Sequence, residues 1–244
     1  MTQRAPDATP RPTVTHLVVV VPARNEQERL PRCLRALQDA VGQLLQQRPL
    51  VVRVVVVLDR CTDGTHGIAA GWPGVDVVVS GHGRVGAARA LGIRHAVAAV
   101  GGPSPAEWIA CTDADSVVPA DWLLTHLWHA DRGADLVLGT VRPDPAELSD
   151  TAMKGWLDRH VLTDGHPHVH GANLGVRADI YHSVGGFADL DVHEDVRFTA
   201  EVRGAGGRVV STGRAPVLTS ARLAGRTPAG MSSYLRRLVT AAAG

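Results

Sequence analysis

Residues 14–26, VTHLVVVVPARNE, carry the pattern that decides the fold: a short run rich in β-branched residues that ends in proline and polar side chains. Continuous apolar runs of this length are typical of strands in a parallel sheet that is covered on both faces. Similar runs return at residues 51–58, 75–80 and 107–112. The first half of the chain therefore predicts four strands of one parallel sheet.

Helical patterns separate these runs. Apolar side chains recur every three or four residues along residues 26–47, which predicts an amphipathic helix. Residues 84–100 are rich in alanine, and residues 119–130 begin with a proline, which the first turn of a helix tolerates. Strand and helix alternate as far as about residue 130, and this order favours a doubly wound α/β sheet flanked by helices.

The second half of the chain is less regular. We predict a strand at 135–141, helices at 146–162, 177–184 and 192–204, a histidine-bearing loop at 165–174, and extended segments at 207–211 and 216–219. No linker rich in glycine, serine or proline divides the chain. The predicted architecture is a single Rossmann-like α/β domain with a mostly parallel central sheet and a smaller C-terminal portion.

Composition excludes several classes of protein. The 244 residues include 25 basic and 24 acidic side chains, so bulk charge gives no attraction to nucleic acid. Three widely spaced cysteines form no C-x-x-C pair, which argues against a disulfide framework or a zinc ribbon and favours the cytoplasm. No apolar run reaches the roughly 18–20 residues of a membrane span. Residues 1–13 lack the apolar core of a secretory signal, and we expect a disordered leader there.

Polar residues follow every predicted strand, at the edge of a parallel sheet where ligands bind. Arg24 and Glu26 follow the first strand, and Asp59 follows the second. The glycine-rich segment 81–86 follows the third strand, and the segment 113–115, Asp-Ala-Asp, follows the fourth. Together these residues predict an anionic ligand with a divalent cation, because Mg²⁺ and Mn²⁺ prefer carboxylate oxygens.

Two of these segments have alternative interpretations. Residues 81–86 match the dinucleotide-binding fingerprint G-x-G-x-x-G, but they follow the third strand, and no strand ending in an acidic residue lies about 20 residues further on. A glycine-rich turn is therefore the favoured interpretation. An isolated Asp-x-Asp is common in solvated turns, but its position after the apolar run 107–112 favours a metal site.

Five segments in this order, VVVVPARNE, VVVLDRCTDGT, ACTDADS, HGANLGVR and GGFADLDVHEDVRF, resemble family 2 of the nucleotide-sugar glycosyltransferases with the GT-A fold. The resemblance covers roughly residues 15–205. It implies a nucleotide-sugar-binding half at 14–130 and an acceptor-binding, catalytic half of the same domain at 131–227. Residues 228–244 would then form a C-terminal helix.

The resemblance implies a role for each matching position. The nucleotide would contact Pro22, Ala23, Arg24, Glu26, Asp59, Arg84 and Asp113. Asp115, together with Asp113, would ligate Mn²⁺ or Mg²⁺ on the diphosphate. The acceptor would contact Gly171, Ala172, Asn173 and Glu194, and Asp195 would act as the general base. The implied reaction moves a sugar from a nucleoside diphosphate to an acceptor hydroxyl, with inversion of configuration.

The sequence departs from the family pattern at two places. Many relatives carry two acidic residues after the second strand, where this chain has Asp59 followed by Arg60, so the base of the donor stays open. Some relatives add a C-terminal histidine to the metal, but no histidine follows His193 here. The metal would then depend on Asp115, the diphosphate and water.

Other functions and other sites also fit parts of the sequence. A nucleotidyltransferase that makes activated sugars would need a glycine-rich basic loop after the first strand, which residues 24–26 do not supply. A non-catalytic nucleotide-sugar-binding protein would need neither the metal nor Asp195. His166, His168 and His170 alternate along one segment, which suggests zinc, a solvated loop, or an acceptor contact through His170.

The C-terminal segment carries two further alternatives. Arg214, Arg222 and Arg226 follow the last extended segments, and they either contact an anionic ligand or form a solvated basic tail. Apolar residues at helical spacing in 231–239 predict a helix that packs on the domain or makes peripheral contact with a membrane. The predicted location is cytoplasmic, with membrane association through this helix as an alternative.

Overall fold

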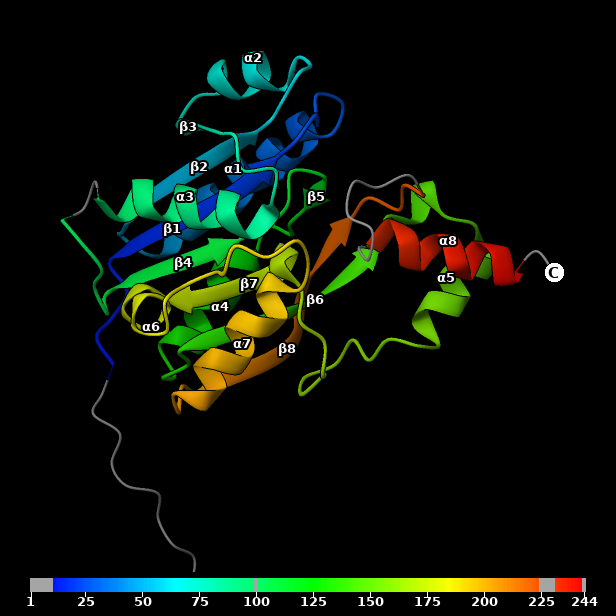
Figure 1. The fold of residues 1–244 in the computed structure, drawn as a ribbon. Coiled ribbons are helices and arrows are strands. Elements are labelled where there is room, and N and C mark those ends of the chain that lie inside the picture. The colour runs from blue at the N-terminus through cyan, green and yellow to red at the C-terminus, as the bar shows by residue number, and fades with distance from the viewer. Residues whose placement is uncertain (1–10, 99–100, 224–230, 243–244) are drawn as a thin grey trace, which may run out of the picture.

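The computed structural model describes residues 11–98, 101–223 and 231–242. The first ten residues of the predicted leader and Arg226 lie outside this part of the chain. An eight-stranded sheet runs through the molecule in the order β3-β2-β1-β4-β7-β6-β8-β5. Helices cover both of its faces (Figure 1). The expectation of a single α/β domain with helices on both sides of a central sheet is confirmed.

The first half follows the predicted alternation. Its elements are β1 (His16–Ala23), α1 (Leu30–Gln47), β2 (Val51–Asp59), α2 (Thr65–Ala70), β3 (Val75–Ser80), α3 (Val85–Ala98) and β4 (Glu107–Cys111). The four strands pair in parallel, as predicted. The short helix α2 was not expected.

The second half contains β5 (Ser116–Val117), α4 (Trp122–Ala130), β6 (Leu136–Pro143), α5 (Asp150–Leu157), β7 (Leu174–Arg177), α6 (Ala178–Ser183), α7 (Glu194–Gly204), β8 (Val209–Thr219) and α8 (Met231–Ala242). Strand β7 lies where a loop was predicted to end, and it pairs antiparallel with both β4 and β6. The two extended segments near the C-terminus are one strand, β8. The helix predicted at 146–162 is shorter, because α5 occupies only eight residues of it.

Strand β4 is the centre of the sheet, and all five of its residues are buried. It lies between β1 and β7. Two hydrophobic clusters cover the two faces: α1 and α4 contribute to one, and α3, α6 and α7 contribute to the other. This position fixes the segment directly after β4, which holds Asp113 and Asp115, at the middle of the carboxyl edge of the sheet.

The C-terminal helix α8 packs against α5 at one end of the sheet (Figure 1). Leu235 is fully buried there, and the Tyr234 ring meets the Trp156 ring edge-on at 5.5 Å. Among the described residues, no helix combines the length and the apolar character needed to cross a membrane. Peripheral membrane contact through α8 stays a prediction.

Glu107, the first residue of β4, gives a test of the packed sheet. Its side chain is 1% exposed, and neither carboxylate oxygen has a hydrogen-bond partner among the described residues. Burial raises the pKa of this carboxyl to about 7. The folded state therefore prefers the protonated form, and the stability gained is present at low pH and lost as the pH rises towards 7.

We expect Glu107→Gln to remove this pH dependence. The free energy of unfolding of the variant should be close to that of the parent protein near pH 5. Near pH 8 it should be larger than the parent's by up to roughly 3 kcal/mol. Thermal unfolding of both proteins across this pH range measures the difference. A gain in stability that does not depend on pH would contradict the conclusion that the buried Glu107 carboxyl is the source of the pH dependence.

Candidate functional site

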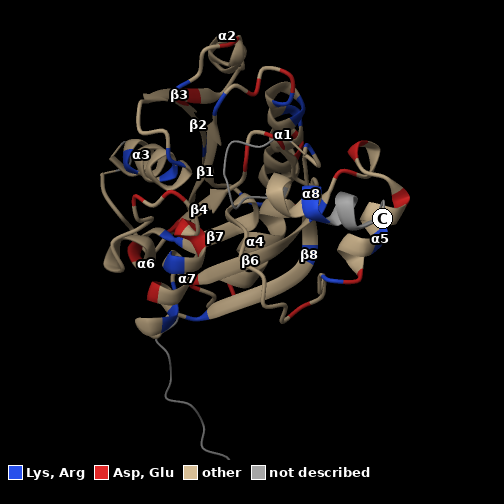
Figure 2. Ribbon diagram, turned by 45° about the vertical axis from the view of Figure 1, so that its right-hand side comes forward, with Lys and Arg blue, Asp and Glu red and all other residues tan. Residues whose placement is uncertain are grey.

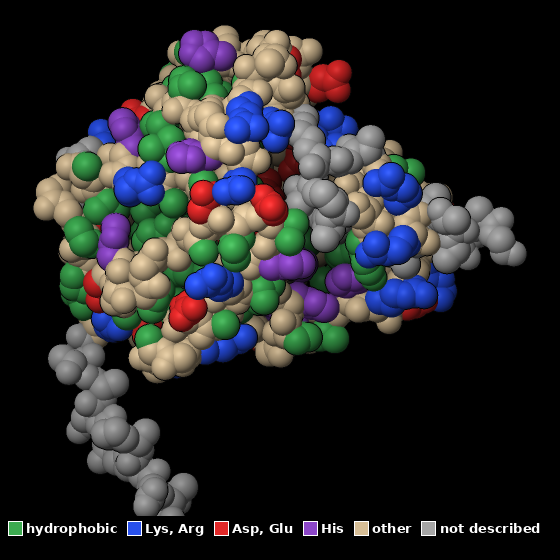
Figure 3. Space-filling model, in the orientation of Figure 1, with side chains coloured by type: hydrophobic (Ala, Val, Ile, Leu, Met, Phe, Trp, Pro, Cys, Tyr) green, Lys and Arg blue, Asp and Glu red, His purple; other side chains and the backbone are tan. Residues whose placement is uncertain are grey.

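A cavity of about 690 Å³ opens at the carboxyl ends of β1, β2 and β4, closed on its far side by the start of α7 and the end of β8. Figure 3 shows acidic side chains inside a hollow on this face of the molecule. Most of the residues predicted for the site line it, namely Pro22, Ala23, Arg24, Glu26, Asp59, Arg84, Asp113, Asp115, Gly171, Ala172, Glu194 and Asp195. The structure thus brings both predicted halves of the site into one space.

Asn173 is the predicted site residue that the structure places elsewhere. Its side chain is 1% exposed and lies in the core. The amide donates to the backbone oxygens of Thr140 and Ala215, at 2.8 and 3.2 Å, and its oxygen accepts from Trp122 Nε1 at 2.8 Å. Asn173 therefore ties β6, β8 and α4 together beneath the cavity.

Asp59, at the carboxyl end of β2, lines one end of the cavity and holds the turn after β3. Its Oδ1 accepts hydrogen bonds from Ser80 Oγ at 2.8 Å and from the Gly83 amide at 2.9 Å. Gly83 has φ +76°, and a Cβ there would meet the Arg60 guanidinium, so this turn requires glycine. The glycines at 81–86 thus shape the edge of the cavity, and Arg84 lies at its entrance in ion pairs with Asp189 and Asp191.

The loops after β1 and β2 are bonded to each other. Asn25 Oδ1 accepts from the Thr62 amide at 2.7 Å, and the Glu26 amide donates to Thr65 Oγ1 at 2.8 Å. Asn25 has φ 53° and Arg60 has φ 54°, a left-handed conformation that asparagine adopts readily and that costs energy for an arginine. The two loops therefore form one bonded wall of the cavity.

Arg89 on α3 is the central cation of the site, and the sequence analysis did not identify it. Its side chain is 3% exposed. Nη2 contacts Asp113 Oδ1 at 2.6 Å, and Nη1 donates to Glu194 Oε1. Burial by itself would lower the pKa of the guanidinium, but the neighbouring Asp113 and Glu194 raise it above its usual value. Figure 2 shows acidic and basic residues side by side where α3 and α7 approach β4 and β7.

Two glycines make room for this buried ion network. A Cβ on Gly171 would collide with the Arg89 guanidinium, and a Cβ on Gly86 would collide with the Glu194 side chain. The signal in the sequence was an arginine between buried alanines on α3, at Ala88 and Ala90. An arginine on the apolar side of a helix needs a buried partner, but the sequence does not say which carboxylate provides it.

Asp195 lies beside Arg89's network without joining it directly. Its Oδ2 accepts from the Gly171 amide and its Oδ1 accepts from the Val196 amide, both at 2.8 Å. These two N–H donors fix the direction of the carboxylate. His193, just before α7, has φ 63°, so the turn that presents Glu194 and Asp195 is held in a strained conformation.

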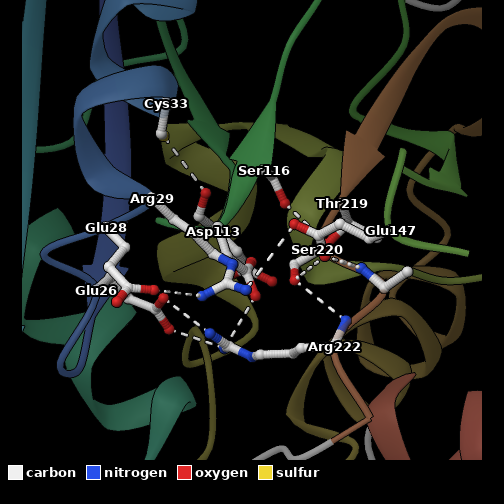
Figure 4. Close-up of polar contacts among 12 residues, drawn as sticks. Glu26, Glu28, Arg29, Cys33, Asp113, Ser116, Glu147, Thr219, Ser220 and Arg222 are labelled. Atoms are coloured by element: carbon white, nitrogen blue, oxygen red, sulfur yellow. Dashed lines mark hydrogen bonds and ion pairs between the residues drawn. The ribbon is translucent and has the colours of Figure 1, made fainter. Parts of the chain in front are cut away.

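Asp115 and Glu26 meet around Arg222, which follows β8. Figure 4 shows Arg222 reaching Glu26. Arg222 binds both oxygens of Glu26 at 2.8 Å, and its Nη2 is 2.9 Å from Asp115 Oδ2. Burial, followed by the nearby Asp113, raises the pKa of Asp115 to about 6, although Arg222 acts in the opposite direction. Arg222 is thus a member of the site, whereas Arg214 lies over the Trp128 ring, outside the cavity.

The charge of the cavity bears on the predicted cation. Seven carboxylates and four guanidiniums line it. An anionic diphosphate would meet this excess of negative charge, and a divalent cation on Asp113 and Asp115 would offset it. Among the described residues no three His, Cys, Asp or Glu side chains are arranged to hold a metal. The two aspartates therefore fit a cation whose remaining ligands come from the diphosphate and water.

The histidine loop reaches the cavity at one end. The rings of His170, His168 and His160 follow one another at 5.9 and 5.1 Å, and His160 stacks on Trp156. Burial and then the neighbouring histidines lower the pKa of His170 to about 3, so the ring that lines the cavity is neutral. His166 is buried, with Nε2 3.2 Å from the backbone oxygens of β6 and β8, and the described histidines form no group that could hold zinc.

Comparison with known proteins agrees with this geometry. The sequence matches the family described as Glycosyl transferase family 2 over residues 18–185. No match was found among curated proteins.

Several solved structures are similar to this one. The S. aureus TarS 1–349 chain in complex with UDP-GlcNAc has a TM-score of 0.63 at 16% identity, covering 93% of this chain and 66% of that one. The mannosyltransferase PcManGT from Pyrobaculum calidifontis, in complex with GDP-Man and Mn²⁺, has a TM-score of 0.58 at 21% identity, covering 90% and 61%. Glucosyl-3-phosphoglycerate synthase from Mycobacterium tuberculosis, in complex with UDP, has a TM-score of 0.54 at 15% identity, covering 93% of this chain and 80% of that one. At these identities the likeness shows the fold.

The compared chains are longer than this one. This chain spans 66% or less of the length of the TarS chains that it matches.

We expect Arg89→Met to destabilise the protein by about 3–5 kcal/mol, because it leaves the buried Glu194 and the partly exposed Asp113 without their cation. Adding Glu194→Gln to this variant should recover part of the loss. Urea unfolding of the single and double variants measures both effects. Arg48→Gln is the matched control, since it removes an arginine from a more exposed ion pair with Asp131. Equal stability of Arg89→Met and the control would contradict the role of Arg89.

Proposed function

This chain belongs to glycosyl transferase family 2 and has the GT-A fold, and we propose that it moves a sugar from a nucleoside-diphosphate donor to an acceptor hydroxyl, with a divalent cation and inversion of configuration. The observation that carries the proposal is that one cavity joins Asp59, the pair Asp113 and Asp115, and Asp195. Similar structures hold UDP-GlcNAc, GDP-Man with Mn²⁺, or UDP, which supports a nucleotide-sugar as the donor.

The nucleoside binds between the loops after β1 and β2 in this proposal. Pro22, Ala23 and Arg24 form one wall, and Asp59 accepts a hydrogen bond from the base. Asp59 uses Oδ1 for Ser80 and Gly83, so the base meets the other oxygen. Arg84, at the entrance, leaves its aspartate partners to contact the base or the diphosphate.

The diphosphate lies over the carboxyl end of β4. Asp113 and Asp115 hold Mn²⁺ or Mg²⁺ there, and the cation stabilises the negative charge that develops on the leaving diphosphate. Arg89 keeps Asp113 in place from below. The cavity requires this compensation because carboxylates outnumber guanidiniums in its lining.

Asp195 takes the proton from the acceptor hydroxyl as that oxygen attacks the anomeric carbon. The amides of Gly171 and Val196 hold its carboxylate in a fixed direction at the cavity wall, as a general base requires. Gly171, Ala172 and Glu194 border the acceptor, together with the neutral ring of His170. Glu194 also orients the start of α7 through its ion pair with Arg89.

The family assignment favours one of the alternatives raised by the sequence. The matched family is one of glycosyltransferases, which supports sugar transfer over nucleotidyl transfer. A binding protein without catalysis would keep the nucleoside wall and dispense with the base at Asp195. The two variants below separate donor binding from turnover and so distinguish an enzyme from a binding protein.

Metal dependence is tested first. We expect UDP or GDP, whichever base the site accepts, to bind at least about tenfold more tightly with Mn²⁺ or Mg²⁺ than with EDTA, because the cation separates the diphosphate from Asp113 and Asp115. Asp115→Asn should remove most of this difference. Asp121→Asn is the control, since Asp121 is exposed and makes no side-chain cap to α4. Calorimetry that finds equal affinity in EDTA would exclude the cation.

The base is tested second. Asp195→Asn should leave metal-dependent nucleotide binding within about twofold and lower turnover at least about a hundredfold, the range expected when a positioned base is lost. Release of nucleoside diphosphate from a panel of nucleotide-sugars measures turnover, with water as the acceptor where no other is known. Asp158→Asn, in an exposed pair with Lys154, is the matched control.

Surviving turnover in Asp195→Asn would show that Asp195 is not the base. Anomeric NMR of the product then decides the mechanism, because retention of configuration needs no such base.

A further inference from the structure

Arg222 joins two carboxylates of the site through one nitrogen. Its Nη2 lies 2.8 Å from Glu26 Oε1 and 2.9 Å from Asp115 Oδ2. Figure 4 shows the guanidinium reaching Glu26. Glu26 is 4% exposed and Asp115 is 16% exposed at the side chain, which keeps bulk water from screening the contact. The nitrogen stands where a cation shared by the two carboxylates would stand.

The backbone that carries Arg222 is anchored, so its side chain is the part that can change position. The Ser220 amide donates to the Asp115 backbone oxygen at 3.1 Å. Ser220 Oγ and the Ala221 amide both donate to Glu147 Oε2, at 2.7 and 2.8 Å. The guanidinium is 23% exposed on the cavity side, in contrast to the 3% of Arg89. Rotation about its side-chain bonds therefore moves Arg222 without disturbing β8.

The cation proposed above and Arg222 compete for Asp115. Mg²⁺ binds oxygen ligands at about 2.0–2.1 Å, so such an ion on Asp115 cannot share the space between Glu26 and Asp115 with Nη2. A metal ion that arrives alone places two positive charges beside the guanidinium. A metal ion that arrives with a diphosphate brings negative charge with it, and the displaced guanidinium can then contact the diphosphate.

We propose that Arg222 holds the cation position in the free enzyme, so that the metal enters only together with the donor and turns the Arg222 guanidinium from Asp115 to the diphosphate. This inference rests on the proposed function, since it assumes that Asp115 ligates a donor-bound metal. The site then excludes free metal ions, and its carboxylates stay neutralised between turnovers. Arg222 acts as a positioning residue in the free enzyme and as a diphosphate ligand in the complex.

The test measures Mn²⁺ binding to the protein without any nucleotide, by electron paramagnetic resonance of the free ion. Arg222→Gln should bind Mn²⁺ at least about tenfold more tightly than the parent protein, because it removes the positive charge that lies against Asp115 and competes with the metal ion. Arg222→Lys keeps the charge and should stay close to the parent. Arg48→Gln, which removes an equal charge from the pair with Asp131, should not change Mn²⁺ binding.

With UDP or GDP present, the order of the affinities of Arg222→Gln and the parent protein should reverse. Arg222→Gln should then bind the nucleotide–Mn²⁺ complex more weakly than the parent, since the displaced guanidinium no longer meets the diphosphate. Adding Asp115→Asn to Arg222→Gln should abolish the gain in Mn²⁺ affinity, which shows that the ion sits at Asp115. Circular dichroism and the melting temperature confirm that each variant is folded.

Equal Mn²⁺ affinity of the parent and Arg222→Gln overturns the inference, and so does a gain that persists after Asp115→Asn. Failure of the proposed metal role is separate from these outcomes. It would appear in the parent protein alone, as nucleotide binding that is the same with Mn²⁺ and with EDTA.

Discussion

The ion network of Arg89 is the constraint on which the site depends. One buried guanidinium joins Asp113, just after the central strand, to Glu194, at the start of α7. Because a buried charge without a partner is costly, each group can be in place only when the other two are. The network thereby sets the distance between the donor end of the cavity and Asp195, whose carboxylate is held next to it by the Gly171 amide.

Two arginines neutralise this site in different ways. Arg89 is 3% exposed and shares its charge between two carboxylates, and Gly171 lets the backbone close on its guanidinium while Gly86 does the same for its partner Glu194. Arg222 is 23% exposed and sits on the cavity side of Asp115 and Glu26. The first arginine is therefore part of the fold. The second is available to respond to an incoming ligand.

The two ends of the cavity carry different polar groups. The loops after β1 and β2, which form one end, are bonded to each other through Asn25 and Thr62. The other end is bordered by backbone at Gly171 and Ala172, by the carboxylates of Glu194 and Asp195, and by His170, whose lowered pKa leaves the ring neutral. In the proposed reaction the first end would receive the nucleotide, and the second would offer the acceptor two carboxylates beside a neutral ring.

The four parallel strands followed from the sequence alone, because continuous β-branched runs are local signals, and most of the residues that the motifs and the family resemblance predicted for the site line the cavity. Tertiary structure decided the features that depend on residues far apart in the sequence, which are strand β7, the position of Asn173 and the pairing of the arginines. Strand β7 has four residues and exists through its pairing with β4 and β6. Asn173 lies in the core rather than the cavity because its amide partners come from β6, β8 and α4. The charge pairs of Arg89 with Glu194 and Arg222 with Glu26 join residues 105 and 196 positions apart. Charge attracts at short range in space whatever the separation along the chain, so only the folded chain shows which carboxylate each arginine meets.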